Sequence, residues 1–169
     1  MNAGPNCLAI IKAFESCRLV SYPDPITRGA PWACGWGACG PEIGPGVQWT
    51  QDRADRRLLG DVAQRELVAS RAITRLVTQG QFDAVVSILY NVGAGRDDRD
   101  GIVRLKSGRS STLLRLLNAG DVEACADEFL KWISPGSNVV NGLLKRRTVE
   151  QAVFRGVSAV DALAIAFQI

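Results

Sequence analysis

Residues 14–40, FESCRLVSYPDPITRGAPWACGWGACG, decide how the rest of the chain is organised. Glu15 lies at the end of a short amphipathic segment, and Asp24 follows in a turn that is rich in proline. A dense run of aromatic residues and glycine comes next, at residues 32–37. A carboxyl group at a helix end that faces a second one on a turn can bracket a polar substrate, so these two acids are the first candidates for chemistry.

The composition is that of a globular protein. With 169 residues, 47% of them hydrophobic and 22% charged, the chain is expected to form one domain and not to be disordered. No apolar run is long enough to span a bilayer, which predicts no stable membrane insertion. The first residues do not resemble a signal peptide, because Lys12 lies inside the apolar stretch and Glu15 follows it. We therefore expect no export signal in this sequence.

The net charge of +3, with an isoelectric point near 8.7, is only mildly basic. It is too weak to predict nucleic-acid binding. It suits an anionic polymer such as a bacterial cell wall, but a solvated surface with a small surplus of arginine explains it equally well.

The cysteine and histidine content limits the chemistry further. An odd number of cysteines leaves at least one thiol free if the others pair, and Cys7 and Cys17 could bridge to each other or to the turn that holds Cys34 and Cys39. A core thiol is the alternative, and it is favoured for Cys125. The chain has no histidine, which excludes Ser-His and Cys-His nucleophiles and argues against a zinc site. We expect no metal and no cofactor.

Hydrophobic periodicity predicts a mostly helical chain of the α+β class, with a small antiparallel β region near the N-terminus and a helical C-terminal lobe. The β region is expected within residues 18–40, and loops are expected at 40–48 and, densely charged, at 93–109. The expected helices cover 6–17 (capped by Asn6), 51–77, 81–92, 112–117 and 122–132, with two more at 141–154 and 159–167 after a turn at 134–138. The expected caps at four of the other helix starts are Thr50, Ser111, Asp121 and Ser158, and Thr78-Gln79-Gly80 is interpreted as the stop after the second helix.

The two acids fit the requirements of a polysaccharide hydrolase. Such an enzyme needs one carboxylic acid to protonate the leaving oxygen and one carboxylate across the sugar ring. Glu15 follows Phe14 and precedes a tryptophan-rich segment, so partial burial is expected to raise its pKa and keep it protonated. Asp24, on a turn, is expected to stay ionised. From spacing alone, two ordinary surface acids are the more common explanation.

Several motifs carry a resemblance to a known family. The run Leu8-x-x-Ile11-Lys12-x-Phe14-Glu15-x-Cys17-Arg18-Leu19-x-x-Tyr22-x-Asp24 resembles the N-terminal signature of the phage-type lysozymes, the endolysins of glycoside hydrolase family 24. The segment that continues to Gly37 resembles the β-hairpin of one branch of that family. Further matches occur in order at residues 49–50, 90–93, 110–114, 117–121, 129–132 and 142–150.

The resemblance implies a single lysozyme-like domain over residues 1–169. A small β-containing lobe would occupy roughly residues 18–50, and a helical lobe roughly residues 70–169, packed with helix 6–17. It implies a muramidase that cleaves the MurNAc-β-1,4-GlcNAc bond of peptidoglycan in cell-wall lysis. Glu15 would be the general acid, and Asp24 would hold or activate the water. The substrate-binding positions implied are Tyr22, Trp36, Tyr90, Asn91 and Arg146, the last of which would also pair with Glu15.

One position departs from the family pattern. Ala33 stands where the family has a catalytic threonine, so a hydroxyl that orients the water is missing. Thr27 and Cys34 lie nearby in sequence, but neither occupies the position of the family threonine. The chain could be a weakened hydrolase, could use another group to position the water, or could carry a substitution that traps an inactive form. A non-catalytic wall-binding protein is the alternative function, and a protein that binds a partner through the 94–109 loop is a third.

The expected partner is peptidoglycan, and the expected state is a monomer that binds no nucleic acid. The resemblance places its action in the bacterial periplasm, on the cell wall, after synthesis in the host cytoplasm. A holin, a removed anchor segment or a secretion apparatus could each provide the route.

Overall fold

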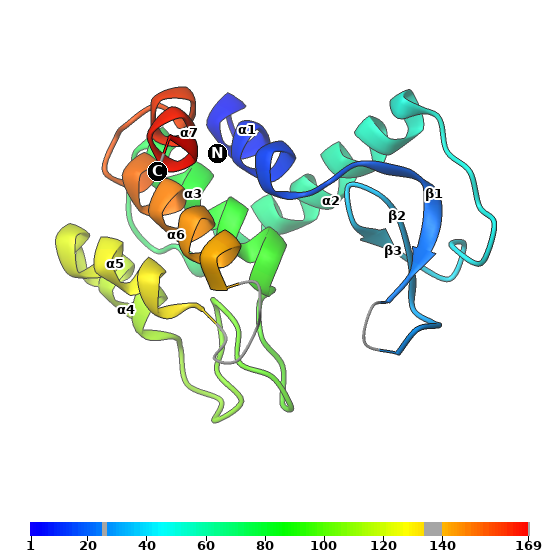
Figure 1. Cartoon of the computed structure of the whole chain (residues 1–169). Coiled ribbons are helices and arrows are strands. Elements are labelled where there is room, and N and C mark those ends of the chain that lie inside the picture. The colour runs from blue at the N-terminus through cyan, green and yellow to red at the C-terminus, as the bar shows by residue number, and fades with distance from the viewer. Residues whose placement is uncertain (25–26, 134–139, 169) are drawn as a thin grey trace.

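The computed structural model describes residues 1–24, 27–133 and 140–168. Over these ranges the chain forms seven α-helices, one 3₁₀ turn and a three-stranded sheet, which confirms the α+β class (Figure 1). The elements are α1 (Pro5–Phe14), β1 (Arg18–Pro23), β2 (Trp32–Gly35), β3 (Ala38–Cys39), α2 (Gln51–Ala72), α3 (Gln79–Val92), α4 (Thr112–Ala119), α5 (Val122–Glu128), the 3₁₀ turn η1 (Phe129–Lys131), α6 (Val140–Phe154) and α7 (Ala159–Phe167). The turn expected at 134–138 lies outside the described residues.

Two clusters of buried side chains hold the fold together. The large cluster surrounds α3, in which every residue from 82 to 89 is buried, and it includes residues of α1, α6 and α7. The small cluster joins the sheet to Trp49 and to the first turn of α2. Helix α2 contributes Ala54 to the small cluster and Leu58, Val62 and Ala69 to the large one.

Helix α2 therefore connects the two parts, and it runs from the sheet to the helical cluster (Figure 1). Burial of apolar side chains at both of its ends ties the sheet to the helices. The division into lobes at 18–50 and 70–169 stays a prediction.

The sheet is antiparallel, in the order β1-β2-β3. Tyr22 of β1 lies opposite Ala33 of β2, and Ala33 lies opposite Cys39 of β3. Cys34 pairs with Ala38 in the same way, and both of these side chains belong to the small buried cluster. Because successive side chains of a strand point to opposite faces, the row Tyr22–Ala33–Cys39 lies on the face that turns away from that cluster.

The predicted N-terminal helix begins and ends earlier than expected. Gly4 precedes its first turn, and Pro5 occupies a position where a missing N–H costs nothing. Asn6 is not the cap of this helix: its Oδ1 accepts a hydrogen bond from the backbone N–H of Ala159, at the start of α7. The helix ends at Phe14, which makes Glu15 its C-cap residue.

The boundary between α2 and α3 was also predicted wrongly. Helix α2 ends at Ala72, and Thr78 begins the next helix instead of ending the previous one. Thr78 and Gln81 form a reciprocal capping box, which satisfies two free donors at the helix start. Gly80, interpreted as a stop, lies inside α3, where an added Cβ would lie only 2.6 Å from the carbonyl oxygen of Val153. Close packing of α3 on α6 explains this glycine.

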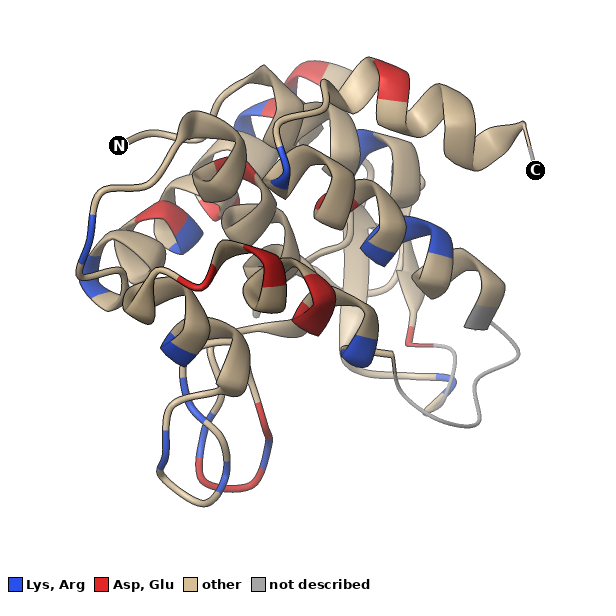
Figure 2. Ribbon diagram, turned by 90° about the vertical axis from the view of Figure 1, so that its left-hand side faces the viewer, with Lys and Arg blue, Asp and Glu red and all other residues tan. Residues whose placement is uncertain are grey.

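The later helices follow the sequence pattern closely. Ser111, Asp121 and Ser158 cap α4, α5 and α7, as predicted. The helix expected over 122–132 passes into the 3₁₀ turn at Phe129. The loop between α3 and α4 carries mixed acidic and basic residues (Figure 2), including the ion pair of Arg104 with Asp97. In the parts of the chain that the structure describes, no helix has the length and apolar character needed to cross a membrane.

Candidate functional site

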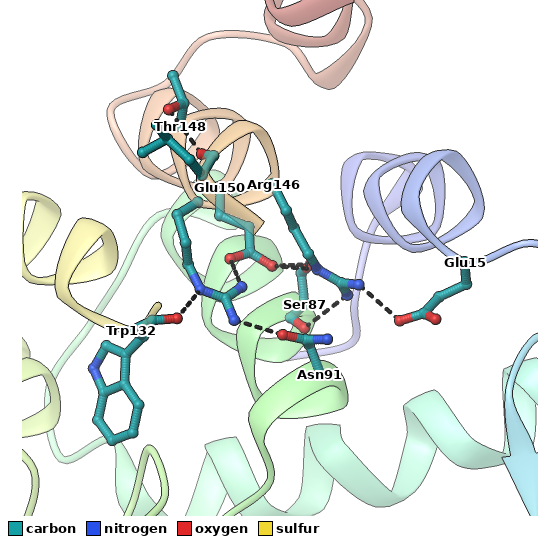
Figure 3. Close-up of polar contacts among 9 residues, drawn as sticks. Glu15, Ser87, Asn91, Trp132, Arg146, Thr148 and Glu150 are labelled. Carbon is teal, nitrogen blue, oxygen red and sulfur yellow. Dashed lines mark hydrogen bonds and ion pairs between the residues drawn. The ribbon is translucent and has the colours of Figure 1, made fainter. Parts of the chain in front are cut away.

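Glu15 meets a buried arginine from the far end of the chain. Arg146 of α6 donates a hydrogen bond from Nη1 to Oε1 of Glu15, over 2.7 Å (Figure 3). The Glu15 side chain keeps 26% of its surface exposed, while that of Arg146 keeps 3%. The carboxylate therefore has one oxygen fixed by the helical part of the protein and remains open on its other side.

Arg146 is itself held by a second carboxylate. Oε1 of Glu150, a fully buried residue, accepts hydrogen bonds from Arg146 Nε at 3.1 Å and from the Ser87 hydroxyl at 2.7 Å. The second carboxylate oxygen accepts from Arg147 Nη1 at 2.6 Å. Arg147 also donates hydrogen bonds to the carbonyl oxygen of Trp132 and to the side-chain oxygen of Asn91. Figure 3 shows this network between α6 and α3, with Glu15 at its open end.

The charges of this network balance. Glu15 and Glu150 supply two negative charges, and Arg146 and Arg147 supply two positive ones. Burial by itself would lower the pKa of Arg146, but the charges of Glu150 and Glu15 raise it above its ordinary value. Arg146 is therefore a permanent cation beside Glu15.

The turn of the hairpin lies beside the other oxygen of Glu15. A Cβ built on Gly37 would lie 3.7 Å from Oε2 of Glu15, so the backbone of this turn faces the oxygen that Arg146 does not hold. The Tyr90 hydroxyl donates to the carbonyl oxygen of Trp36 at 2.8 Å, which connects α3 to the same turn. The Trp36 indole donates to Asp55, and the Lys12 ammonium lies over its ring. These contacts fix the hairpin relative to Glu15.

Asp24 lies at the end of β1. Its Oδ1 accepts a hydrogen bond from the backbone N–H of Thr27 at 2.9 Å, and its own N–H donates to the carbonyl oxygens of Gly29 and Pro31. Two residues earlier, the Tyr22 ring lies under the Arg18 guanidinium, 4.3 Å from the ring centroid. Burial, with the nearby Cys39 and Glu15 groups, raises the pKa of the Tyr22 phenol.

The contacts above connect four of the residues that the sequence nominated: Glu15, Trp36, Tyr90 and Arg146. Tyr22 and Ala33 are cross-strand partners in the sheet, and Asp24 follows β1. Asn91 belongs to a neighbouring pocket of about 480 Å³, which is lined by Trp132, Arg147 and the loop after α3 among others. Asn91 is connected to Glu15 through a chain of hydrogen bonds that passes along Arg147, Glu150 and Arg146.

The five cysteines all lie in described residues and all are free thiols, so none of the bridges considered from the sequence forms. Cys7 and Cys125 are buried, and burial raises the pKa of both thiols. The Cys34 thiol is buried and points to the carbonyl oxygens of Arg18 and Leu19. Cys39 is exposed on the opposite face of the sheet.

Sequence reasoning gave no role to Ser87, Arg147 or Glu150, although these residues complete the site. Arg146 and Arg147 lie four and three residues before Glu150, a spacing that allows ion pairs within one helix. Such pairs are usually solvent-exposed, and spacing cannot show that these are buried. The sequence signal that could have indicated their burial was the presence of charged residues between the apolar residues of one helix.

Tyr90 gives the stability of the protein a specific pH dependence. Burial, together with the charges of Asp61 and Glu15, raises the pKa of the Tyr90 phenol, while Arg65 and Arg146 oppose the shift. The folded protein keeps this proton above about pH 10, where the unfolded chain loses it. The contribution of Tyr90 is therefore complete below that pH and falls as the pH rises further.

Tyr90→Phe should cost about 1 kcal/mol in unfolding free energy at neutral pH, from the lost hydrogen bond to Trp36. The difference between parent and variant should shrink above about pH 10. Urea unfolding of both proteins at neutral and alkaline pH measures it, and a difference that does not change with pH would contradict the assignment.

The chain is similar in sequence and in fold to known proteins. A family model described as "Phage lysozyme" matches residues 12–150. The endolysin of Bacillus phage B103 is 36% identical over 154 residues, which cover 91% of this chain and 54% of that protein. The endolysin of Acyrthosiphon pisum secondary endosymbiont phage 1 is 32% identical over 158 residues and is covered to 98% of its length.

Among solved structures, the endolysin of Escherichia coli O157:H7 phage FAHEc1 superposes with a TM-score of 0.72 at 29% identity, covering 92% of this chain and 94% of that one. The chain spans about half the length of the first curated relatives that it matches, the endolysins of Bacillus phages B103 and PZA.

Proposed function

The chain belongs to the phage lysozyme family, and we propose that it hydrolyses the β-1,4 bond between N-acetylmuramic acid and N-acetylglucosamine in peptidoglycan. The observation that carries the proposal is the position of Glu15. This carboxyl group ends α1, is held on one oxygen by buried Arg146, and presents its other oxygen to the hairpin. A carboxyl group fixed at one oxygen and accessible at the other is suited to deliver a proton in one direction.

Glu15 is the general acid of the reaction. Its Oε2, which faces the Gly37 turn, carries the proton to the oxygen of the leaving sugar as the glycosidic bond breaks. The carboxylate that results is stabilised by the Arg146 cation, 2.7 Å from Oε1. This contact becomes stronger as the negative charge develops, so it favours the transition state over the ground state.

Asp24 accepts the proton of the water that completes the reaction. The oxygen of the water forms a bond to the anomeric carbon of the muramic acid, and its proton passes to the Asp24 carboxylate. One water is consumed, one glycosidic bond is broken, and a reducing end and a free hydroxyl are formed. The Asp24 carboxylate is fixed for this role by the N–H of Thr27.

The remaining nominated residues bind the glycan. The Tyr22 and Trp36 rings are polarised by neighbouring cations and offer flat surfaces to sugar rings. Tyr90 fixes the hairpin through Trp36, and Asn91 lines the pocket beside Arg147. We assign the first two residues to the sugar next to the cleaved bond and Asn91 to a more distant part of the substrate.

We further propose that the protein acts as a monomer on the bacterial cell wall from the periplasmic side, after synthesis in the host cytoplasm. Its partner is peptidoglycan, with no nucleic acid and no cofactor. Lysis of the host cell is the resulting process.

The test is direct. Purified protein incubated with insoluble peptidoglycan should release reducing ends and should clear a suspension of Gram-negative cells made permeable with chloroform. The alternative function, a wall-binding protein that has lost turnover at Ala33, predicts retention on peptidoglycan with no release of reducing ends. Retention without turnover by the unmutated chain would overturn the hydrolase proposal in favour of that alternative.

A further inference from the structure

Three side chains from three strands form one row on the face of the sheet that is turned away from its core. Tyr22, Ala33 and Cys39 are direct cross-strand partners. The Cβ atoms of directly opposed residues in an antiparallel pair lie about 4.5–5.5 Å apart. The small methyl of Ala33 therefore lies between a phenol on one side and a thiol on the other.

The other thiol of the sheet, that of Cys34, lies on the opposite face and is not part of this row. Cys34 and Ala38 form the neighbouring cross-strand pair and are buried in the small cluster. The Cys34 thiol already points to the carbonyl oxygens of Arg18 and Leu19. Among the cysteines of the sheet, only Cys39 shares the face of Ala33, and it is exposed.

The row adjoins both candidate acids. The Cys39 thiol lies 3.8 Å from the carbonyl oxygen of Gly37, the residue whose α-carbon faces Oε2 of Glu15. The backbone of Cys39 is held by Arg57, whose Nη2 donates to its carbonyl oxygen at 2.8 Å. On the other side, Tyr22 lies two residues before Asp24 on β1. A water above Ala33 would therefore lie between the groups assigned to acid and base.

We propose that this row is the water-positioning site of the enzyme and that the Cys39 thiol replaces the hydroxyl that Ala33 lacks. The inference rests on the proposed glycosidase function and names the group that holds its water. The thiol and the Tyr22 hydroxyl hydrogen-bond to the water on either side of the Ala33 methyl, and Asp24 receives its proton. Cys39 forms no covalent bond with the substrate.

The chemical state of Cys39 suits this role. Partial burial of the sulfur, together with the charge of Asp24 and a smaller effect of Asp61, raises the pKa of the Cys39 thiol, although Arg57 opposes the shift. At neutral pH the group is a neutral thiol, which donates one hydrogen bond and accepts weakly. A neutral thiol is a weaker hydrogen-bonding partner than a hydroxyl, so serine at this position should work at least as well.

The experiment compares Cys39→Ala and Cys39→Ser with the parent in the release of reducing ends from peptidoglycan. Loss of one positioning contact should lower kcat by about tenfold to a hundredfold and leave KM within about twofold. Cys39→Ser should retain or exceed the activity of the parent. Cys17→Ser is the matched control, because its thiol contacts Gln51 and lies outside the row.

A second pair of variants separates positioning from a purely structural role. Ala33→Thr restores a hydroxyl at the centre of the row, so Cys39→Ala should cost much less in that background than in the parent. A cost that is equal in both backgrounds would overturn the inference, as would full activity of Cys39→Ala. Loss of activity in Tyr22→Phe but not in Cys39→Ala would assign the water to the phenol alone and would also overturn it.

Failure of the inference and failure of the proposed function give different results. If the parent is inactive and Ala33→Thr is active, the scaffold is a hydrolase but Cys39 does not replace the hydroxyl. If the parent, Ala33→Thr and Cys39→Ser are all inactive while the proteins remain folded, the proposed function fails and the inference fails with it.

Discussion

Replacing Glu15 with glutamine is expected to reduce the release of reducing ends from peptidoglycan by about a hundredfold to ten-thousandfold. The amide has nearly the same shape as the carboxylic acid but cannot deliver a proton to the leaving oxygen. It also removes the charge that Arg146 stabilises at 2.7 Å as the bond breaks. Both effects act on the chemical step, so kcat should fall far more than KM changes.

The same substitution should change stability little. The Glu15 side chain is 26% exposed, and Arg146 keeps Glu150 as a second partner after the substitution. We expect the unfolding free energy of Glu15→Gln to stay within about 1 kcal/mol of the parent, since partly exposed ion pairs contribute little.

Glu123→Gln is the matched control, because Glu123 also pairs with an arginine, Arg155, but is 73% exposed and belongs to a different ion pair. It should leave both activity and stability unchanged. Activity of Glu15→Gln close to that of the parent would remove Glu15 from the mechanism, whereas an unfolded Glu15→Gln would show that its pair with Arg146 is structural.

Glu150→Gln is expected to have the opposite profile, with a loss of about 3–5 kcal/mol in unfolding free energy. Glu150 is completely buried and is the only carboxylate that contacts both Arg146 and Arg147 in the described part of the chain. Glutamine fills the same space, so the loss does not come from a cavity. It comes from removing the buried charge that both guanidinium groups contact. Arg147 then keeps the neutral oxygens of Trp132 and Asn91 as its hydrogen-bond partners, and Arg146 keeps the partly exposed Glu15.

Urea unfolding, followed by circular dichroism, measures this loss directly, with Glu123→Gln again as the control. If Glu150→Gln does not accumulate as a folded protein, Ser87→Ala tests the same network more gently. The Ser87 hydroxyl donates to Oε1 of Glu150 at 2.7 Å, and its removal should cost about 1.5–3 kcal/mol. Stabilities of Glu150→Gln and Ser87→Ala close to that of the parent would show that the buried network does not depend on these contacts.

The two substitutions together distinguish the roles of neighbouring acids. Glu15 and Glu150 both bind Arg146, from opposite ends of its guanidinium group. One faces the hairpin and the other lies inside the helical cluster. Because the difference is one of burial, activity should respond mainly to Glu15 and stability mainly to Glu150.

Much of the secondary structure could be predicted because it depends on local interactions. The apolar periodicity of residues 82–89 and the caps at Ser111, Asp121 and Ser158 act within a few residues of the chain. The errors occurred where a local signal had two interpretations. Thr78 followed by Gly80 is consistent with a helix end or a helix start, and packing against Val153 decides between them. Asn6 matched a cap locally, yet its partner is Ala159.

The candidate site, too, could be predicted only where local signals were sufficient. The sequence placed Glu15 at a helix end, and the family resemblance nominated Arg146 as its partner, which the structure bears out as a contact. Nothing local marked Glu150 and Arg147 as buried, because the burial of a charge depends on which helices surround it. Nor did spacing place Cys39 beside Ala33, since strand register follows from the turn between β2 and β3.

By itself, the sequence determined the α+β class, most of the helices, and a stretch at residues 14–40 that carries Glu15 and Asp24. The tertiary structure decided which oxygen of Glu15 is held, which charges lie beneath it, and which thiol shares the face of Ala33. The physical reason is the range of the interactions. Helix periods and caps are set over a few neighbouring residues, whereas Glu15 and Arg146 are 131 positions apart and meet only when α1 and α6 pack together.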